Sequence, residues 1–234
     1  MSLITTVMAL IVMTSLIAWA VAAWVHNRAE ALHLVQIPND RSSHAHPTPN
    51  GGGLGIVVAG SLSGFCLVLF SGWGLGGFVL GLAAVLAAVG LRDDFAHLSA
   101  RVRFGTQVVV CAGLLFVLGD LPTLAIRVGF EFQVVGWLLF GLLLLLGVWW
   151  INLFNFMDGI DGIAGTQAVF MLLAGAALAT WSHPESMSSP ALIWMLFVAA
   201  ATAGFLIVNW PPAKIFMGDV GSTWLAFMVF ALAL

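Results

Sequence analysis

The stretch VVGWLLFGLLLLLGVWWI (134–151) decides the fold, because it carries no charge and has the length needed to cross a bilayer as a helix. Similar runs recur along the 234-residue chain, in which only 7% of the residues are charged and the mean hydropathy is +1.10. Since unpaired backbone polar groups cannot face lipid, each run is predicted to be helical. The expected spans are 3–25, 54–71, 74–91, 105–121, 134–151, 163–181 and 191–208, with an eighth that begins near 220. The sequence therefore predicts an all-α, polytopic transmembrane protein in a lipid bilayer, with one domain over residues 1–234.

The motif NLFNFMDGIDG (152–162) follows this run directly. Four oxygen-bearing side chains recur in it at steps of three residues, so a continuing helix would place them on one face. They are Asn152, Asn155, Asp158 and Asp161. Mg²⁺ prefers oxygen ligands and leaves other positions to water and substrate phosphate. Helix capping explains one or two of these residues but not all four, so the spacing predicts a metal–phosphate site.

Two further motifs, GLRDDF (90–95) and IFMGDVGS (215–222), bring the number of motif aspartates to five, among ten acidic residues in all. Asp93 and Asp94 are neighbours and would point about 100° apart on a helix, so one is expected to face a metal and the other a nucleophile. Two carboxylates about 4 Å apart repel by roughly 4 kcal/mol at an effective dielectric constant near 20, which favours a bound cation.

Each of these two motifs also has a simpler interpretation. Asp93 and Asp94 would end a solvated helix, with Arg92, Arg101 or Arg103 as partners. Asp219 would cap the eighth helix. The occurrence of all three motifs in one chain favours a common site.

Basic residues predict the orientation in the membrane, because they concentrate in cytoplasmic loops. Loops after odd-numbered spans hold Arg28, Arg41, Arg92, Arg101, Arg103 and Lys214, whereas Arg127 alone lies in a loop of the other set. The N-terminus is therefore expected outside, and every aspartate motif at the cytoplasmic face. On the opposite face, the segment 121–133 is expected to form a short hairpin and the segment 182–190 a plain loop.

The longest polar stretch, 26–53, contains His44 and His46 and ends in PTPNGGG (47–53). Its three glycines, Gly51 to Gly53, allow the backbone to approach a ligand or another helix closely. The stretch is predicted to lie over the membrane interface.

Together these segments resemble the polyprenyl-phosphate N-acetylhexosamine-1-phosphate transferases. The resemblance rests on RSSHAHPTPNGGG (41–53), GLRDDFAHLSARVRFGTQ (90–107), NLFNFMDGIDG and FMGDVGS (216–222), in the family's order. The first motif is most similar to the branch that starts O-antigen synthesis. The resemblance implies transfer of a sugar-1-phosphate from a UDP-sugar to undecaprenyl phosphate, with release of UMP and a need for Mg²⁺, or Mn²⁺ as an alternative. It also implies a bacterial cytoplasmic (inner) membrane protein without a nucleic-acid partner.

The resemblance carries roles onto individual residues. The catalytic residues would be Asp93, Asp94, Asp158 and Asp219, with Asp93 as a base or orienting group for the lipid phosphate. The metal ligands would be Asp219, Asn155 and Asp158. Residues that bind substrate would be Asn152, Asn155, Asp161, Phe216, Lys214, Arg103, His44 and His46, with Phe216 stacked on uracil. The sugar, the oligomeric state and the choice between direct attack and a covalent intermediate stay open.

Three departures from the family pattern affect the expectation. Asn50 stands where relatives often have a basic residue, and Arg92 stands where they usually have an apolar one. The chain ends at Leu234, inside an apolar run of about 13 residues after Thr223, whose helix would cover about 20 Å of a roughly 30 Å core. The family's histidine-rich cytoplasmic loop would come later, so we expect a C-terminally truncated chain with an incomplete eighth span.

Two other functions are considered. One is a non-catalytic remnant of such an enzyme. The other is a cation-coupled transporter, since acids in membrane proteins often mark ion pathways. Transporter sites lie near the bilayer midplane, whereas these acids are expected at one face, which favours the transferase.

Overall fold

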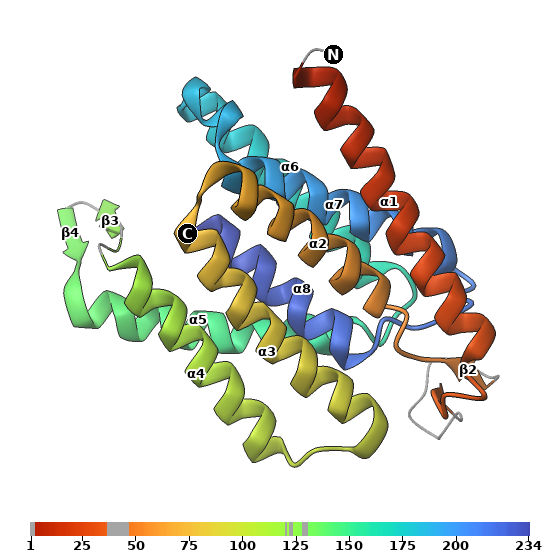
Figure 1. Cartoon of the computed structure of the whole chain (residues 1–234). Helices are drawn as coiled ribbons and strands as arrows, with labels where there is room; N and C mark the ends of the chain where they lie inside the picture. Colours follow the sequence, from red (N-terminus) through yellow and green to blue (C-terminus); the bar gives the residue numbers. More distant parts are fainter. Residues whose placement is uncertain (1–2, 37–46, 120, 122–123, 128–130) are drawn as a thin grey trace.

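The computed structural model describes residues 3–36, 47–119, 121, 124–127 and 131–234. Over these residues the chain is almost entirely helical, as predicted, and seven helices are long and apolar enough to cross a membrane (Figure 1). The helices are α1 (Leu3–Arg28), α2 (Leu54–Ser71), α3 (Gly74–Ala96), α4 (Ala100–Leu118), α5 (Gly136–Met157), α6 (Ile163–Ser182), α7 (Pro190–Asn209) and the shorter α8 (Gly218–Ala233). The protein is therefore an all-α, multi-pass membrane protein.

Helix α8 occupies the middle of the bundle and contacts α2, α3, α5, α6 and α7 (Figure 1). Its central residues, from Trp224 to Met228, are completely buried. A helix that is apolar on all sides needs such surroundings, because each of its faces must be covered. The start of α8 is thereby held at a fixed place among the ends of its neighbours.

Glycines allow α8 to approach α2 and α3 very closely. A Cβ atom at Gly90 of α3 would lie 2.5 Å from the carbonyl oxygen of Asp219, and one at Gly53 would lie 2.5 Å from the Cα of Gly221. Small residues at helix interfaces are typical of membrane proteins, where van der Waals packing drives helix association. These contacts set the depth at which the first turn of α8 sits against α3.

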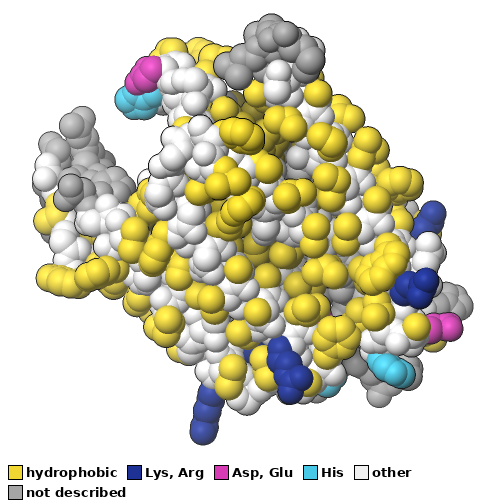
Figure 2. Space-filling model, in the orientation of Figure 1, with side chains coloured by type: hydrophobic (Ala, Val, Ile, Leu, Met, Phe, Trp, Pro, Cys, Tyr) yellow, Lys and Arg dark blue, Asp and Glu magenta, His cyan; other side chains and the backbone are white. Residues whose placement is uncertain are grey.

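The exposed face of the bundle is apolar, as Figure 2 shows. Lys and Arg side chains appear along the lower and right edges of that view, near the ends of α1 and α3. This distribution is typical of a helix bundle whose middle faces lipid.

Extended segments are short. The predicted hairpin is confirmed as β3 (Leu124–Arg127) paired antiparallel with β4 (Glu131–Val134). Two further strands, β1 (Val35–Gln36) and β2 (Thr48–Pro49), pair before α2. The prediction of a plain loop over 182–190 is wrong, because it contains the 3-10 helix η1 (Pro184–Ser188).

Three helices extend further into the polar motifs than the apolar runs indicate. Helix α3 continues to Ala96 instead of 91, α5 continues to Met157 instead of 151, and α4 begins at Ala100 instead of 105. Hydropathy shows only where a run becomes polar. The helices continue further because the polar side chains of these turns form hydrogen bonds with neighbouring helices. Asp93, Arg103 and Asn155 therefore lie on the end turns of helices at one end of the bundle.

Candidate active site

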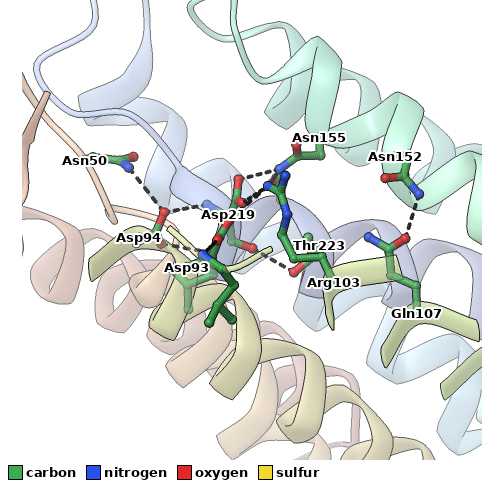
Figure 3. A network of polar contacts seen from close by, with 12 residues as sticks. Asn50, Asp93, Asp94, Arg103, Gln107, Asn152, Asn155, Asp219 and Thr223 are labelled. Carbon is green, nitrogen blue, oxygen red and sulfur yellow. Dashed lines mark hydrogen bonds and ion pairs between the residues drawn. The ribbon is translucent and has the colours of Figure 1, made fainter. Parts of the chain in front are cut away.

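The guanidinium group of Arg103 joins two of the motif aspartates (Figure 3). Its Nη1 lies 2.9 Å from Oδ2 of Asp93, on the last turn of α3, and 3.2 Å from Oδ2 of Asp219, on the first turn of α8. The Asp93 side chain is only 7% exposed, whereas that of Arg103 is 42% exposed. The simpler interpretation is therefore confirmed in the partner, since Arg103 pairs with Asp93 at the end of α3, but it is wrong about solvation, because the Asp93 side chain is buried.

Asp94 makes contacts of another kind. Its Oδ1 accepts a hydrogen bond from the backbone N–H of Asp219 at 2.9 Å, and its Oδ2 accepts one from the N–H of Val220 at 3.1 Å. Asn50 donates a third bond, from Nδ2 to Oδ1, at 3.2 Å (Figure 3). A carboxylate of α3 thus covers the N-terminal end of α8.

Asn155 connects α5 with the same turn of α8. Its Nδ2 donates to Oδ1 of Asp219 at 2.6 Å and to Oγ of Ser222 at 2.8 Å. Both bonds use the amide nitrogen, so the carbonyl oxygen of Asn155 stays available as a ligand for a cation or a sugar hydroxyl. Asn155 and Asp219, two of the predicted metal ligands, are therefore direct neighbours.

Asp158, the third predicted metal ligand, lies just past the end of α5 and is half-buried. Loss of water around its carboxyl group raises the pKa of Asp158 well above its usual value, and the nearby charge of Asp219 adds to this shift. The backbone N–H of Gly218 acts in the opposite direction by hydrogen bonding. A cation beside these two carboxylates would favour the ionised form of Asp158.

The predicted helical face of four side chains is wrong beyond Met157, because α5 ends there. Asp161 lies in the turn that follows, where its Oδ2 accepts the backbone N–H of Ala213 at 2.9 Å. Buried Asn209 fastens the same turn, since its Oδ1 accepts the N–H of Gly162 at 3.0 Å and its Nδ2 donates to the carbonyl oxygen of Ile215 at 2.9 Å. Asp161 thus connects the loop after α5 with the loop before α8. This contact is separate from the hydrogen bonds of the Asp219 side chain.

Asn152 completes the polar side of a cavity. Its Nδ2 donates to Oε1 of Gln107 at 2.6 Å. A cavity of about 210 Å³ lies beside this pair, with Arg103, Asn155 and Asp219 on its polar side. Its apolar wall includes Leu86, Val89 and Phe104. A phosphate group with an attached hydrocarbon chain suits such a lining.

Two of the remaining predicted substrate-binding residues, Lys214 and Phe216, lie on the segment between α7 and α8. Phe216 is partly buried, and its backbone joins the glycine segment through a bond from its N–H to the carbonyl oxygen of Pro49 and one from the N–H of Gly52 to its own carbonyl oxygen. Lys214 is exposed on the loop before α8. His44 and His46 lie outside the described residues.

Four residues of this network lack an assigned role in the sequence analysis. They are Asn50, Gln107, Asn209 and Ser222. Asn50, Gln107 and Ser222 stand inside the motifs, which was an available signal. Asn209 is the last residue of α7, and its amide side chain at the end of an apolar run was the signal to follow.

The oxygen atoms of Asp219, Asn155 and Asp158 fit a magnesium ion that also binds water and substrate phosphate. Among the residues that the structure describes, no group of three or more His, Cys, Asp or Glu side chains is placed to hold a metal alone. Mg²⁺ in phosphate-handling sites commonly takes only one or two carboxylates and completes its shell with water and substrate phosphate. Asp219, with Asn155 beside it and Asp158 nearby, offers that kind of incomplete shell.

An apolar helix bundle with acids, amides and an arginine gathered at one end defines the class as multi-pass membrane proteins with a polar site. The family model of glycosyl transferase family 4 matches residues 77–234, and the chain belongs to this family.

The curated relatives described here are all named as transferases. The chain is 34% identical over 208 residues to a probable undecaprenyl-phosphate N-acetylglucosaminyl 1-phosphate transferase of Bacillus subtilis. This match covers 86% of the present chain and 54% of the relative. It is 31% identical over 231 residues to a decaprenyl-phosphate N-acetylglucosaminephosphotransferase of Mycolicibacterium smegmatis, covering 92% and 56%. It is 30% identical over 203 residues to a phospho-N-acetylmuramoyl-pentapeptide-transferase of Streptococcus pneumoniae, covering 80% and 59%. The chain thus spans 54–59% of the length of these relatives.

Proposed function

We propose that this protein transfers an N-acetylhexosamine-1-phosphate from a UDP-sugar to undecaprenyl phosphate, with release of UMP, as the first membrane step of a cell-envelope polysaccharide such as O-antigen. The observation that carries the proposal is the convergence of Asp93, Asp219, Arg103 and Asn155 at one end of a membrane helix bundle, beside a cavity that is polar on one side and apolar on the other. The family and the relatives' names support the same reaction class.

The residues divide the work of phosphoryl transfer, which depends on positioning and charge neutralisation. Asp219, Asn155 and Asp158 would hold Mg²⁺, or Mn²⁺, which supplies charge neutralisation at the diphosphate. Arg103, which lines the cavity, would turn from its carboxylate partners towards a phosphate that enters it. Asp93, at the other end of that ion pair, would orient the acceptor phosphate.

The edges of the site suit the nucleotide. Phe216 would stack on uracil, and Lys214 would face the diphosphate from the loop before α8. Asp161 fixes the loop that carries both residues through its bond to the N–H of Ala213. Asn152 and its partner Gln107 would bind the sugar or the acceptor phosphate from the far side of the cavity. His44 and His46 would add positive charge from the loop before α2.

The arrangement also suits a cytoplasmic active site in the bacterial inner membrane with the N-terminus outside. The motif residues lie at the end of the bundle where α1 ends and α4 begins (Figure 1). Arg28, Arg101 and Arg103 stand at these two helix ends, and cytoplasmic loops are enriched in such residues. Labelling of single cysteines at positions 101 and 133 in intact cells tests this orientation, since only position 133 should react with an impermeant thiol reagent.

The experiment that tests the function is UMP release by membranes that contain this chain, with undecaprenyl phosphate and a panel of UDP-sugars, in Mg²⁺ or EDTA. We expect release that needs the metal, selects one UDP-N-acetylhexosamine, and is lost in Asp219→Asn. Release that persists in EDTA or in the variant contradicts the assigned site.

Absence of release in all conditions, together with retained Mn²⁺ binding, would favour the non-catalytic remnant. Uptake of a solute into sealed vesicles without a nucleotide sugar would favour the transporter. The position of the acids at helix ends, away from the middle of the spans, makes the transferase the better supported of the three functions.

A further inference from the structure

We propose that Asp94 is a positioning residue, which holds the first turn of α8 and thereby aims the Asp219 carboxylate, and that Asn50 holds Asp94 in place. The proposal assigns different work to two neighbouring aspartates. Asp93 faces Arg103, which lines the cavity, whereas Asp94 faces backbone N–H groups and an amide. The expected effect on UMP release rests on the proposed function, whereas the capping of α8 by Asp94 does not depend on it.

The first turn of α8 needs an external partner. The first four N–H groups of a helix have no partner within it. The residue at the N-cap position is Met217, and no side chain of α8 caps the helix. Asp219 therefore does not cap its own helix, contrary to the simpler interpretation of its position. Asp94 supplies the missing acceptors from α3 and satisfies the N–H groups of Asp219 and Val220.

Charge and enclosure strengthen this contact. A carboxylate at a helix N-terminus is favoured by the helix dipole. Gly218 has φ of +75° and its added Cβ would lie 2.9 Å from both carboxylate oxygens of Asp94 and 2.8 Å from Oδ1 of Asn50. The carboxylate is thus enclosed between the start of α8 and Asn50, with little space for a substrate atom.

The geometry links this cap to the site. The backbone N–H of Asp219 is bound by Asp94, while its side chain reaches Asn155 at 2.6 Å and Arg103 at 3.2 Å. When the backbone of Asp219 shifts, its carboxylate shifts with it. If Asp94 acted as a base, the incoming proton would compete with the bonds that cap α8.

The test compares Asp94→Asn and Asn50→Ala with Asp93→Asn as the matched control. The first variant places an amide NH₂ group against one N–H donor, and the second removes a single bond to Asp94. The control removes one carboxylate charge at the adjacent position and leaves the cap of α8 intact. Hydrogen–deuterium exchange is measured in detergent on peptides that span residues 217–223, and affinity for Mn²⁺ is measured by electron paramagnetic resonance.

We expect exchange at Asp219 and Val220 to be about tenfold faster in Asp94→Asn, the size of effect that loss of a helix cap produces. Asn50→Ala should change it in the same direction by a smaller factor, and Asp93→Asn should leave it unchanged. Mn²⁺ affinity should fall in Asp94→Asn. Residual UMP release should keep its pH profile, because a positioning residue does not itself transfer a proton.

Unchanged exchange in both Asp94→Asn and Asn50→Ala would overturn the proposal. So would Asp94→Asn with normal exchange and Mn²⁺ affinity but with the acidic limb of the pH profile removed, since that result identifies a base. If the unmodified chain releases no UMP, the proposed function fails, while exchange and Mn²⁺ binding still decide the role of Asp94. If Asp94→Asn does not fold, the Asn50→Ala arm decides it.

Discussion

Replacing Gly90 by alanine tests whether the close contact between α3 and α8 sets the position of Asp219. The new Cβ would lie 2.5 Å from the carbonyl oxygen of Asp219 and 2.8 Å from the Cα of Val220, both backbone atoms that cannot rotate away. An ordinary contact needs about 3.4 Å, so the helices must separate by about 0.9 Å. Overpacking of this kind costs about 1–3 kcal/mol.

The same shift has a predictable effect on the site. The bond from Asn155 to Asp219 is 2.6 Å long, and a displacement of the Asp219 backbone by about 0.9 Å would pull the carboxylate out of this bond. Loss of a bond to a charged group costs about 1.5–3 kcal/mol, so UMP release should fall by about 10- to 100-fold. Thermal unfolding in detergent and the UMP assay measure the two effects separately.

Gly81→Ala is the matched control, because it makes the same change on the same helix where no atom lies within 4 Å of the new Cβ. It should be neutral or stabilising by up to about 1 kcal/mol, since alanine favours a helix over glycine. If the Gly90 variant unfolds at the same temperature as the Gly81 variant and is equally active, the close contact does not position Asp219.

Three further predictions concern the charges of the site. Arg103→Ala should lower UMP release at least as much as the Gly90 change while leaving Mn²⁺ affinity equal or higher, because a competing cation is removed from Asp219; a fall in affinity would contradict this. Asn155→Leu should weaken Mn²⁺ binding about tenfold through loss of the amide oxygen and of its bond to Asp219, measured by paramagnetic resonance with Ser222→Ala as the milder control. Because the pKa of Asp158 is raised, Mn²⁺ affinity should increase with pH as this carboxyl loses its proton, thermal stability without metal should fall over the same range, and Asp158→Asn should reduce both dependences; curves that keep the same slope would refute the assignment.

The spans were predictable from sequence because lipid imposes a simple rule on length and polarity. The run 134–151 lies within α5 apart from its first two residues, and the hairpin at 124–134 followed from alternating residues. The three-residue spacing of Asn152 and Asn155 correctly predicted that the helix continues past residue 151, but it also carried the helix to Asp161, whereas α5 ends at Met157. The partners of the two asparagines, Gln107 and Asp219, come from other helices and were not predictable.

The sequence indicated which residues gather at the site better than it indicated what each of them contacts. Composition alone marks the aspartates, since few charges occur elsewhere. Nothing local distinguishes Asp93 from Asp94, because the partners of Asp94 are N–H groups on a helix that begins 124 residues later, at Gly218. Asp161 similarly gave a misleading signal: its three-residue spacing predicted a shared helical face, whereas a turn after Met157 directs it to the loop at Ala213.

The structure explains how so many carboxylates share one end of a bundle. Two carboxylates about 4 Å apart repel by roughly 4 kcal/mol at an effective dielectric constant near 20, so a set of five needs several sources of positive charge. The helix dipole and backbone N–H groups of α8 serve Asp94, and Arg103 serves Asp93 and Asp219 together. Among the residues that the structure describes, no cationic side chain pairs with Asp158, and loss of water around its carboxyl group together with the charge of Asp219 raises its pKa. A divalent ion held by Asp158 and Asp219 would neutralise both carboxylates and would release Arg103 for a phosphate, so we expect binding of the metal and of the substrate to favour each other.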